Sequence, residues 1–436
     1  MLKRIFTIAL LTGTGQVFVI FALKFISQNS SAEQVKAIGQ TDSLVLFIIN
    51  VIALGLQPAT MRDLALTDNW KQGYLDTQSA RLTASFFIAF FAILALVDRS
   101  YLVFLMAPFL ALSGDYALYG RGYPVKGAII ALLRAVIPFL ILILFIKIDA
   151  SQLVWAYMSS ILLIYIITNR IISVFLGTRN FVQPELKNLK LYLRSLPLGA
   201  VALSIYVLGL GLALVSSYFY SAAVVAVTYI GLKFYVIFKG VLRVLHQAFV
   251  KDMTDDKISL KIDQLSSLAG LSLAAYMIIF PTTVISLFFG KQYVPENIYF
   301  ILIGISAFVY SLFASITTTS LLERKDARYA IVYTIASLLA IVMTMLFSIK
   351  YDTPVVISIS LLTGECIFTI LSFSFLSSRK YIKDRLLFYS RNLVFVFIPL
   401  SFRLFFSDNM LPFILSAIIF FIAVGFTYFK KFSLLS

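Results

Sequence analysis

Long apolar runs alternate with short polar segments along the whole chain. The runs are close to the roughly 20 residues that a helix needs to cross the hydrocarbon core of a bilayer. Because backbone groups inside lipid must be hydrogen-bonded within the chain, such runs predict helices. We place them at residues 5–27, 42–61, 82–97, 100–119, 127–146, 152–169, 195–215, 218–238, 265–289, 297–320, 329–349, 354–377, 392–406 and 411–429. The pattern predicts an all-α polytopic membrane protein with about 14 transmembrane helices, or 12 in the alternative count.

Composition supports this class. The 436 residues are 61% hydrophobic and have a mean hydropathy of +0.96, which excludes a soluble globular protein. The net charge of +16 raises the question of nucleic-acid binding. However, 32 of the 36 Lys and Arg residues lie outside the apolar runs, and 27 of those 32 lie on one side when the N-terminus is placed inside. The positive-inside rule explains this asymmetry, so we expect cytoplasmic N- and C-termini and no nucleic-acid partner.

The first apolar run can also be read as a secretory signal peptide. Lys3 and Arg4 precede it, and Ser30-Ser31-Ala32 resembles a cleavage site. Its apolar part is long and interrupted by polar residues, so we expect a retained first helix.

Side chains for metal binding or catalysis are scarce. Cys366 is the only cysteine, so no internal disulfide can form, and the single His246 cannot build a multi-histidine metal site. The sequence has no Walker A loop and no nucleophile elbow. We therefore expect no cofactor, no metal and no enzymatic activity.

Weak self-similarity at an offset of about 190 to 200 residues suggests an internal duplication. Arg62-Asp63 at the end of the second run corresponds to Lys251-Asp252 after the eighth run, because each is a basic residue followed by an aspartate. The alternative is that basic inner loops look alike by composition alone. A duplication predicts two six-helix lobes with pseudo-two-fold symmetry, which in transporters bind substrate between them. The expected parts are an N-terminal lobe 1–176, a basic linker 177–194, a C-terminal lobe 195–377 and two additional helices in 378–436.

Some ionisable residues lie within the apolar runs, where a charged side chain costs on the order of 2.5–3.5 kcal/mol near the helix centre. They are Lys24, Arg134, Lys233, Arg403, Asp115 and Glu365. Lys24 and Arg403 are near the outer ends of their runs, so their side chains can snorkel to the interface; for Lys24 a cavity role is the alternative. Arg134 and Lys233 are deeper, and we predict that they face a water-filled cavity.

A basic helical face continues below Lys233. Lys239, Arg243 and His246 follow at helical spacing. This face is either the solvated end of a helix or the lining of a cavity that attracts an anionic head group through charge-assisted hydrogen bonds.

Glu365 and Asp115 are the acids in the interior of the apolar runs. Carboxyl groups at such depth often carry protons in transporters, so either residue is a candidate for ion coupling. The alternative is a structural ion pair with Arg134 or Lys233.

Several short motifs resemble the polysaccharide transporter branch of the multidrug/oligosaccharidyl-lipid/polysaccharide flippase superfamily. They are the Lys3-Arg4 start, the segment Gly55-Leu56-Gln57-Pro58-Ala59-Thr60-Met61-Arg62-Asp63, Tyr119-Gly120-Arg121 after the fourth run, and the basic hairpin from Glu323 to Arg328. The motifs are loose, although the resemblance covers most of the chain. It is nearest in character to the Wzx-type O-antigen and capsule repeat-unit flippases.

The resemblance implies translocation of an undecaprenyl-pyrophosphate-linked oligosaccharide across a bacterial inner membrane, from the cytoplasmic to the periplasmic leaflet. It implies alternating access driven by a proton or sodium gradient, with polysaccharide polymerase and chain-length machinery as partners. The expected pyrophosphate and glycan contacts are Arg134, Lys233, Lys239 and Lys24, with Arg62 and Arg243 at the cytoplasmic entrance. The expected ion-coupling residues are Glu365 and Asp115.

Three other functions stay open from the sequence. A multidrug efflux antiporter exports organic cations and favours buried acids, whereas buried cations outnumber buried acids four to two here. A lipid II flippase would have a similar number of spans. An O-antigen polymerase or ligase normally carries a long outer loop, and no predicted outer segment is long enough for one.

Overall fold

The structure, a computed structural model, describes residues 2–66, 69–179, 182–248, 256–312, 314–316, 325–376 and 379–432. In these ranges all regular structure is helical, without strands. Thirteen helical segments of the described residues are long and apolar enough to cross a membrane, and the apolar segment Met410–Gly425 is shorter than these. The predicted all-α polytopic fold is thus confirmed.

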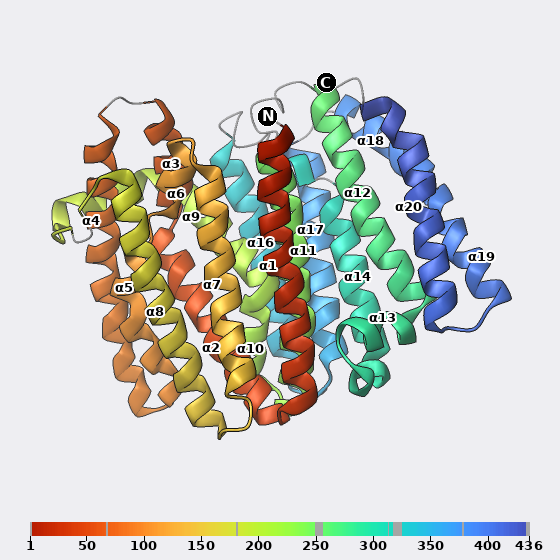
Figure 1. Cartoon of the computed structure of the whole chain (residues 1–436), viewed down its shortest axis with the longest axis horizontal. Coiled ribbons are helices and arrows are strands. Elements are labelled where there is room, and N and C mark those ends of the chain that lie inside the picture. Colours follow the sequence, from red (N-terminus) through yellow and green to blue (C-terminus); the bar gives the residue numbers. More distant parts are fainter. Residues whose placement is uncertain are drawn as a thin grey trace. The chain divides into compact units, whose positions relative to one another are not determined.

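The helices follow the predicted runs in order along the chain (Figure 1). Their bounds are α1 (Leu2–Asn29), α2 (Ala32–Ala53), α3 (Leu56–Leu66), α4 (Trp70–Ala89), η1 (Phe90–Leu96), η2 (Arg99–Met106), α5 (Ala107–Ala111), α6 (Asp115–Gly120), α7 (Pro124–Leu144), α8 (Ala150–Leu176), η3 (Leu186–Leu189), α9 (Lys190–Tyr206), η4 (Val207–Gly211), α10 (Leu212–Phe219), α11 (Ala222–Ala248), α12 (Asp256–Ile279), α13 (Pro281–Phe288), η5 (Lys291–Glu296), α14 (Asn297–Ser311), α16 (Asp326–Ser348), α17 (Pro354–Leu376), α18 (Arg379–Asn392), η6 (Leu393–Val396), α19 (Phe397–Phe405) and α20 (Met410–Phe432).

The second helix begins at Ala32, well before the predicted start at residue 42. Ser31 caps it: Ser31 Oγ accepts from the Gln34 N–H at 3.2 Å, and Gln34 Oε1 accepts from the Ser31 N–H at 2.8 Å. This capping box satisfies two N–H groups that have no partner within the helix. The hydropathy pattern did not show this start because polar residues occupy the first turns of α2. Because the helix begins at Ala32, Asp42 lies in the interior of α2 and not at its first residue.

The predicted run 100–119 is not one continuous helix. It consists of the 3₁₀ segment η2 and the short helices α5 and α6, with residues 112–114 non-helical between them. Gly114 lies in this break, and a Cβ atom there would be only 2.3 Å from Tyr74 Oη. Close approach of α4 to the break therefore requires a glycine.

The predicted run 195–215 is also interrupted. The π segment η4 joins α9 to α10, and Leu208 and Gly209 in it have non-helical backbone angles. A Cβ atom on Gly209 would lie 2.7 Å from Val236 Cγ2 of α11. The small residue lets the two helices pack closely at the kink.

The helices form two compact units. The first comprises Met1–Ile237 and Asp326–Thr353, and the second comprises Phe238–Lys325 and Pro354–Ser436. In the first unit α1 packs along α7, and α16 packs against α9 and α10; in the second, α14 packs against α12 and α17. These units do not follow the predicted lobes 1–176 and 195–377, and that division stays a prediction.

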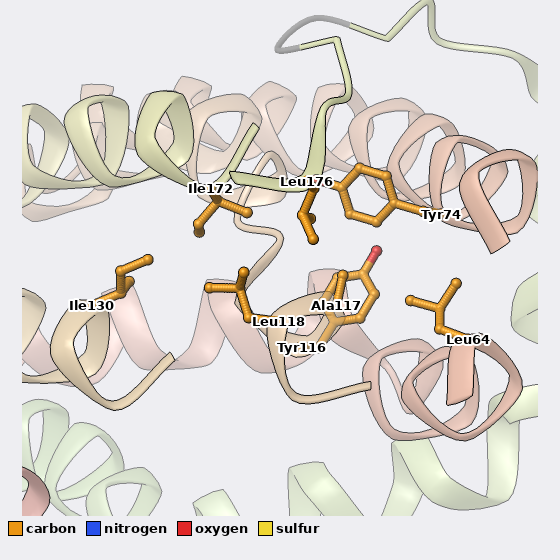
Figure 2. Close-up of a cluster of buried hydrophobic side chains, with 8 residues drawn as sticks. All are labelled: Leu64, Tyr74, Tyr116, Ala117, Leu118, Ile130, Ile172 and Leu176. Atoms are coloured by element: carbon orange, nitrogen blue, oxygen red, sulfur yellow. The ribbon is translucent and has the colours of Figure 1, made fainter. Parts of the chain in front are cut away.

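A buried apolar cluster in the first unit joins α3, α4, α6, α7 and α8 (Figure 2). Its members are Leu64, Tyr74, Tyr116, Ala117, Leu118, Ile130, Ile172 and Leu176. Because lipid is as apolar as these side chains, close packing rather than removal from water holds them together. Tyr74 and Tyr116 form the edge of the cluster that meets a polar network.

Candidate functional site

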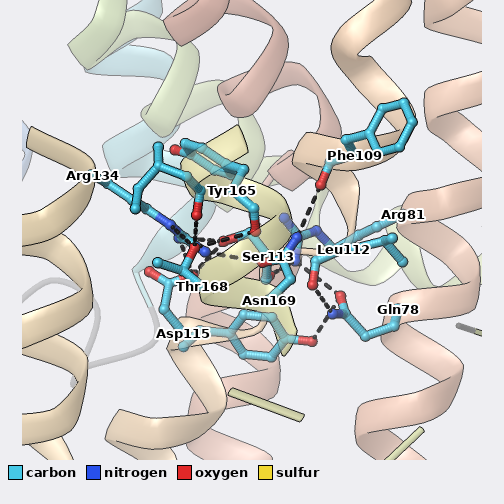
Figure 3. Close-up of polar contacts among 12 residues, drawn as sticks. Gln78, Arg81, Phe109, Leu112, Ser113, Asp115, Arg134, Tyr165, Thr168 and Asn169 are labelled. Carbon is cyan, nitrogen blue, oxygen red and sulfur yellow. Dashed lines mark hydrogen bonds and ion pairs between the residues drawn. The ribbon is translucent and has the colours of Figure 1, made fainter. Parts of the chain in front are cut away.

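Arg134 of α7 is the centre of this network (Figure 3). Its Nη1 lies 3.4 Å from Asp115 Oδ1 and donates to Ser113 Oγ at 2.6 Å. Its Nε donates to Thr168 Oγ1 at 2.9 Å, and its Nη2 donates to Asn169 Oδ1 at 3.0 Å. The side chain of Arg134 is 9% exposed and that of Asp115 is 34% exposed. The structure therefore brings two of the sequence-predicted residues together as an ion pair.

Arg81 of α4 extends the network, although it precedes the third predicted run, 82–97. Helix α4 begins at Trp70 and continues through Arg81, which is 1% exposed. Its Nη1 donates to Gln78 Oε1 at 3.0 Å and to the carbonyl oxygen of Ser113. Its guanidinium lies 5.5 Å from the ring centroid of Tyr116. Hydropathy averaged over a window could not show that this arginine is buried.

The side chains around these arginines also hydrogen-bond the backbone at the α5–α6 break. The carbonyl of Leu112 accepts from Gln78 Nε2 at 2.8 Å, and the carbonyl of Phe109 accepts from Asn169 Nδ2 at 3.1 Å. Non-helical backbone at membrane depth is tolerated only where protein or water satisfies it. The network thus holds the helix break open.

Lys233 of α11 forms a second ion pair in the first unit. Its Nζ lies 2.6 Å from Asp42 Oδ2, and both side chains are mostly buried. Tyr229 donates to Asp42 Oδ2 and Tyr157 of α8 donates to Asp42 Oδ1, both at 3.0 Å. Lys233 also lies 5.3 Å from the ring centroid of Phe139. The sequence-predicted cation is thus held by an acid that sequence analysis did not propose, because Asp42 fell at the edge of a predicted run.

Lys239 and Glu365, both in the second unit, form a third pair. Lys239 Nζ lies 3.1 Å from Glu365 Oε1, and the two side chains are 7% and 0% exposed. The ring centroid of Tyr310 lies 4.6 Å from Lys239 Nζ. A predicted head-group contact and a predicted ion-coupling residue are therefore neighbours in the structure.

Asp263 of α12 and Arg385 of α18 form a fourth pair, also in the second unit, which sequence analysis did not predict. Arg385 Nε donates to Asp263 Oδ2, and the two side chains are 4% and 0% exposed, respectively. The N–H of Ser315 donates to Asp263 Oδ1 at 2.8 Å and its Oγ to Oδ2 at 2.6 Å. Arg385 Nη2 donates to Ser259 Oγ at 3.0 Å. Asp263 precedes the predicted run 265–289, and Arg385 lies between the runs 354–377 and 392–406, so neither residue interrupts an apolar run.

The other predicted site residues are less enclosed. Lys24 lies on α1 and is partly exposed, and Arg243 lies near the end of α11 and is exposed. Arg62 belongs to α3, but its side chain lies outside the described part of the structure.

These contacts correct the count of four buried cations against two acids. Within the described ranges, the buried clusters contain the cations Arg81, Arg134, Lys233, Lys239 and Arg385, and the acids Asp42, Asp115, Asp263 and Glu365. Charges in a low-dielectric interior need partners, so the acids were to be expected near the cations. A five-to-four balance weakens the argument against multidrug efflux.

Comparison with known proteins finds similarity in structure alone. No protein family model matches the chain, and no curated protein matches it by sequence. A solved structure of the lipid II flippase MurJ in an inward closed conformation is 14% identical, with a TM-score of 0.71 over 97% of this chain and 99% of that one. An inward-facing multidrug resistance MATE family transporter of the MOP superfamily is 15% identical, with a TM-score of 0.59 over 88% of this chain and 98% of that one. A MATE protein in complex with MaL6 gives 14% identity and a TM-score of 0.51 over 89% and 96%.

At such low identity these likenesses show the fold. They cover nearly the whole of both chains, so the similarity is not limited to a few adjacent helices. The chain is a polytopic membrane protein with the helical fold of the MurJ and MATE structures.

Proposed function

We propose that the chain is a flippase that moves an undecaprenyl-pyrophosphate-linked oligosaccharide from the cytoplasmic to the periplasmic leaflet by alternating access. The oligosaccharide would be an O-antigen, capsule or exopolysaccharide repeat unit. The observation that carries the proposal is the contact of Lys233 with Asp42 at 2.6 Å inside a membrane helix. A carboxylate oxygen there takes the place that a pyrophosphate oxygen would occupy.

The surroundings of Asp42 suit an exchange of partners. Tyr157 and Tyr229 donate to different oxygens of its carboxylate, each at 3.0 Å. When Lys233 turns toward a pyrophosphate, Asp42 therefore keeps two hydrogen bonds, and the cost of leaving a buried carboxylate unpaired is reduced. The same exchange returns Lys233 to Asp42 once the head group has left.

The proposal also includes the remaining expected residues. Arg134, Lys239 and Lys24 would contact the pyrophosphate and glycan, with Arg62 and Arg243 at the cytoplasmic entrance. Asp115 and Glu365 are each within ion-pair distance of one of these cations. Protonation of either acid would release its cation for the head group, which would couple translocation to a proton gradient; a sodium ion could compete for the carboxylate in the same way.

The fold is shared by a flippase of a lipid-linked substrate and by multidrug transporters, so it is compatible with the proposal without selecting the substrate. A lipid II flippase is the second candidate, because the MurJ structure matches 97% of this chain and 99% of its own. A multidrug antiporter has the same architecture, with a TM-score of 0.59. In the proposed setting the protein lies in a bacterial inner membrane, with cytoplasmic termini and with polysaccharide polymerase and chain-length machinery as partners.

Transport in proteoliposomes tests the proposal. Purified protein is reconstituted with a fluorescent polyprenyl-pyrophosphate oligosaccharide, and exposure in each leaflet is followed with and without a proton gradient. We expect Lys233→Ala to slow translocation about 10- to 100-fold, because a charge-assisted hydrogen bond to the pyrophosphate is lost. Lys233→Arg should keep part of the rate, since its charge is retained.

Lys147→Ala is the matched control, because Lys147 is an exposed lysine of the same unit. It should transport at the wild-type rate. A well-expressed Lys233→Ala protein with full activity would remove Lys233 from the head-group site. Export of a cationic dye without lipid movement would favour the multidrug alternative, and movement of lipid II alone would favour the second candidate.

A further inference from the structure

Arg81 and Arg134 converge on one serine at the break between α5 and α6 (Figure 3). Arg81 Nη1 donates to the carbonyl oxygen of Ser113, and Arg134 Nη1 donates to Ser113 Oγ at 2.6 Å. An arginine side chain is always charged in proteins, so the two guanidinium groups repel each other. Among the described residues, Asp115 is the one carboxylate within ion-pair distance of either arginine, at 3.4 Å from Arg134.

This cluster differs from the other buried ionic clusters in its charge. Among the described residues, the Lys233–Asp42, Lys239–Glu365 and Arg385–Asp263 ion pairs each join one cation to one acid. The cluster at the break holds two cations and one acid, which leaves one net positive charge. An uncompensated buried charge is costly, so a counter-ion would stabilise this site more than the other three.

Arg81 itself retains unused hydrogen-bonding capacity. It is 1% exposed, and its Nε is buried without a hydrogen-bond partner in the described part of the chain. Its partners at Nη1, Gln78 and the carbonyl of Ser113, are uncharged. Burial without an acid partner is rare for arginine, whose planar group is best satisfied by two oxygens of one anion.

We propose that Arg81 and Arg134 bind an oxyanion of the phosphate class at the α5–α6 break. Guanidinium groups bind such oxygens through paired N–H bonds. The hydroxyl group of Ser113 donates to Asp115 Oδ1 at 2.6 Å, so it becomes free to donate to the anion once Asp115 is displaced. The partly exposed Asp115, at 34%, marks the side on which an anion reaches Arg134. Its carboxylate would give up Arg134 to the incoming anion.

The same chemistry can come from two sources. One is the pyrophosphate of a lipid-linked substrate, and the other is a free phosphate or pyrophosphate. The site deepens the proposed function and rests on it where the anion is a lipid-linked pyrophosphate, whereas binding of a free anion requires no lipid movement.

Binding of labelled inorganic pyrophosphate to the purified full-length protein in detergent tests the site. We expect Arg81→Gln to weaken binding about tenfold or more, because one of two guanidinium groups is removed. Asp115→Asn should strengthen binding about tenfold, because it removes the nearby negative charge while keeping the side chain's shape. Arg99→Gln, at an exposed arginine of the same unit, should bind like the wild type.

Asp115→Asn separates this site from a purely structural network, which would predict no gain in affinity. If Arg81→Gln does not fold, the pyrophosphate affinities of Asp115→Asn and Arg81→Lys are measured in its place. The proposal is overturned if the wild-type protein binds no pyrophosphate at millimolar concentration, or if Asp115→Asn and the folded Arg81 variant both bind with wild-type affinity.

Competition with farnesyl pyrophosphate distinguishes the sources. If it displaces labelled pyrophosphate at lower concentration than unlabelled pyrophosphate does, the anion is a lipid head group; the reverse order assigns a free anion. Proteoliposome transport is measured on the same samples. If the protein transports lipid but binds no anion at Arg81, this site is overturned and the flippase proposal stands. If it binds the anion but transports no lipid, the site stands and the flippase proposal is overturned.

Discussion

Two Asp–Arg pairs in this protein have similar parts and different surroundings. Asp263–Arg385 in the second unit is enclosed, with side chains 0% and 4% exposed, and Ser315 satisfies both oxygens of the acid. Asp115–Arg134 in the first unit is looser, with an atom separation of 3.4 Å and an acid that is 34% exposed. A second arginine adds charge to the looser pair, whereas the enclosed pair is neutral within the described ranges.

The difference distinguishes a structural ion pair, Asp263–Arg385, from an ion pair whose partners can be exchanged, Asp115–Arg134. We call the first a structural tie. In the enclosed pair every polar atom of the acid is already bonded, so replacing its partner would require the helices to separate. In the looser pair the acid is partly exposed, and we expect that another anion can replace it. Ion pairs within a membrane protein therefore cannot be judged by residue type, only by enclosure and charge balance.

Breaking the enclosed pair should have the largest effect on stability. Arg385→Leu leaves Asp263 buried without its cation, and we expect a loss of about 3–5 kcal/mol in the free energy of unfolding. Unfolding by SDS in mixed micelles, followed by circular dichroism, measures it. The double variant Arg385→Leu/Asp263→Leu should recover much of the loss, because no charge remains unpaired. Equal loss in the single and double variants would contradict the view of this pair as a structural tie.

Gly39→Ala should disturb the Asp42–Lys233 pair without changing a charged residue. A Cβ atom at Gly39 would lie 2.6 Å from Tyr229 Cγ, so the tyrosine must move away from Asp42. We expect a loss of about 1–3 kcal/mol from overpacking, together with slower translocation. The same SDS titration and the proteoliposome assay measure the two effects.

Gly73→Ala is the matched control for Gly39→Ala, because it is also a helical glycine but has nothing within 4 Å of the added atom. It should leave transport unchanged and raise stability by about 0.5–1 kcal/mol, since alanine favours the helix. If both variants behave alike, the contact of Tyr229 with Asp42 has no role.

A smaller effect is expected at the start of α2. Ser31→Ala removes the side-chain acceptor for the Gln34 N–H and should cost about 1 kcal/mol. Ser31 is exposed, so the buried ion pairs are unaffected and transport should stay at the wild-type rate. Thermal unfolding in detergent measures the change. A transport defect in this variant would mean that α2 begins differently in the membrane.

The membrane fold could be predicted well because it follows from local composition. Apolar runs of sufficient length can only be helices in lipid, so each predicted run has a helix in the structure. The breaks at residues 112–114 and within η4 were missed, because both lie in apolar sequence and depend on packing against α4 and α11. The lobe division and the membrane orientation stay predictions.

The candidate site was only partly visible in the sequence. Arg134, Lys233, Asp115 and Glu365 stood out because they interrupt apolar runs, and the structure places each in an ion pair. Asp42, Arg81, Asp263 and Arg385 did not stand out, because each lies at or beyond the edge of a predicted run. Hydropathy averages over neighbours along the chain and cannot detect a partner on another helix.

The sequence by itself determined that this is a helical membrane protein with costly charges in its spans, because lipid penalises unpaired backbone groups and charges near the bilayer centre whatever the tertiary structure. Only the tertiary structure decided which charges are paired and which cluster has more cations than acids. That outcome depends on distances between helices far apart in the chain, such as the 191 positions that separate Asp42 from Lys233. When two charged side chains lie within a few ångströms of each other, the sign of the partner's charge decides whether their electrostatic interaction stabilises or destabilises the protein.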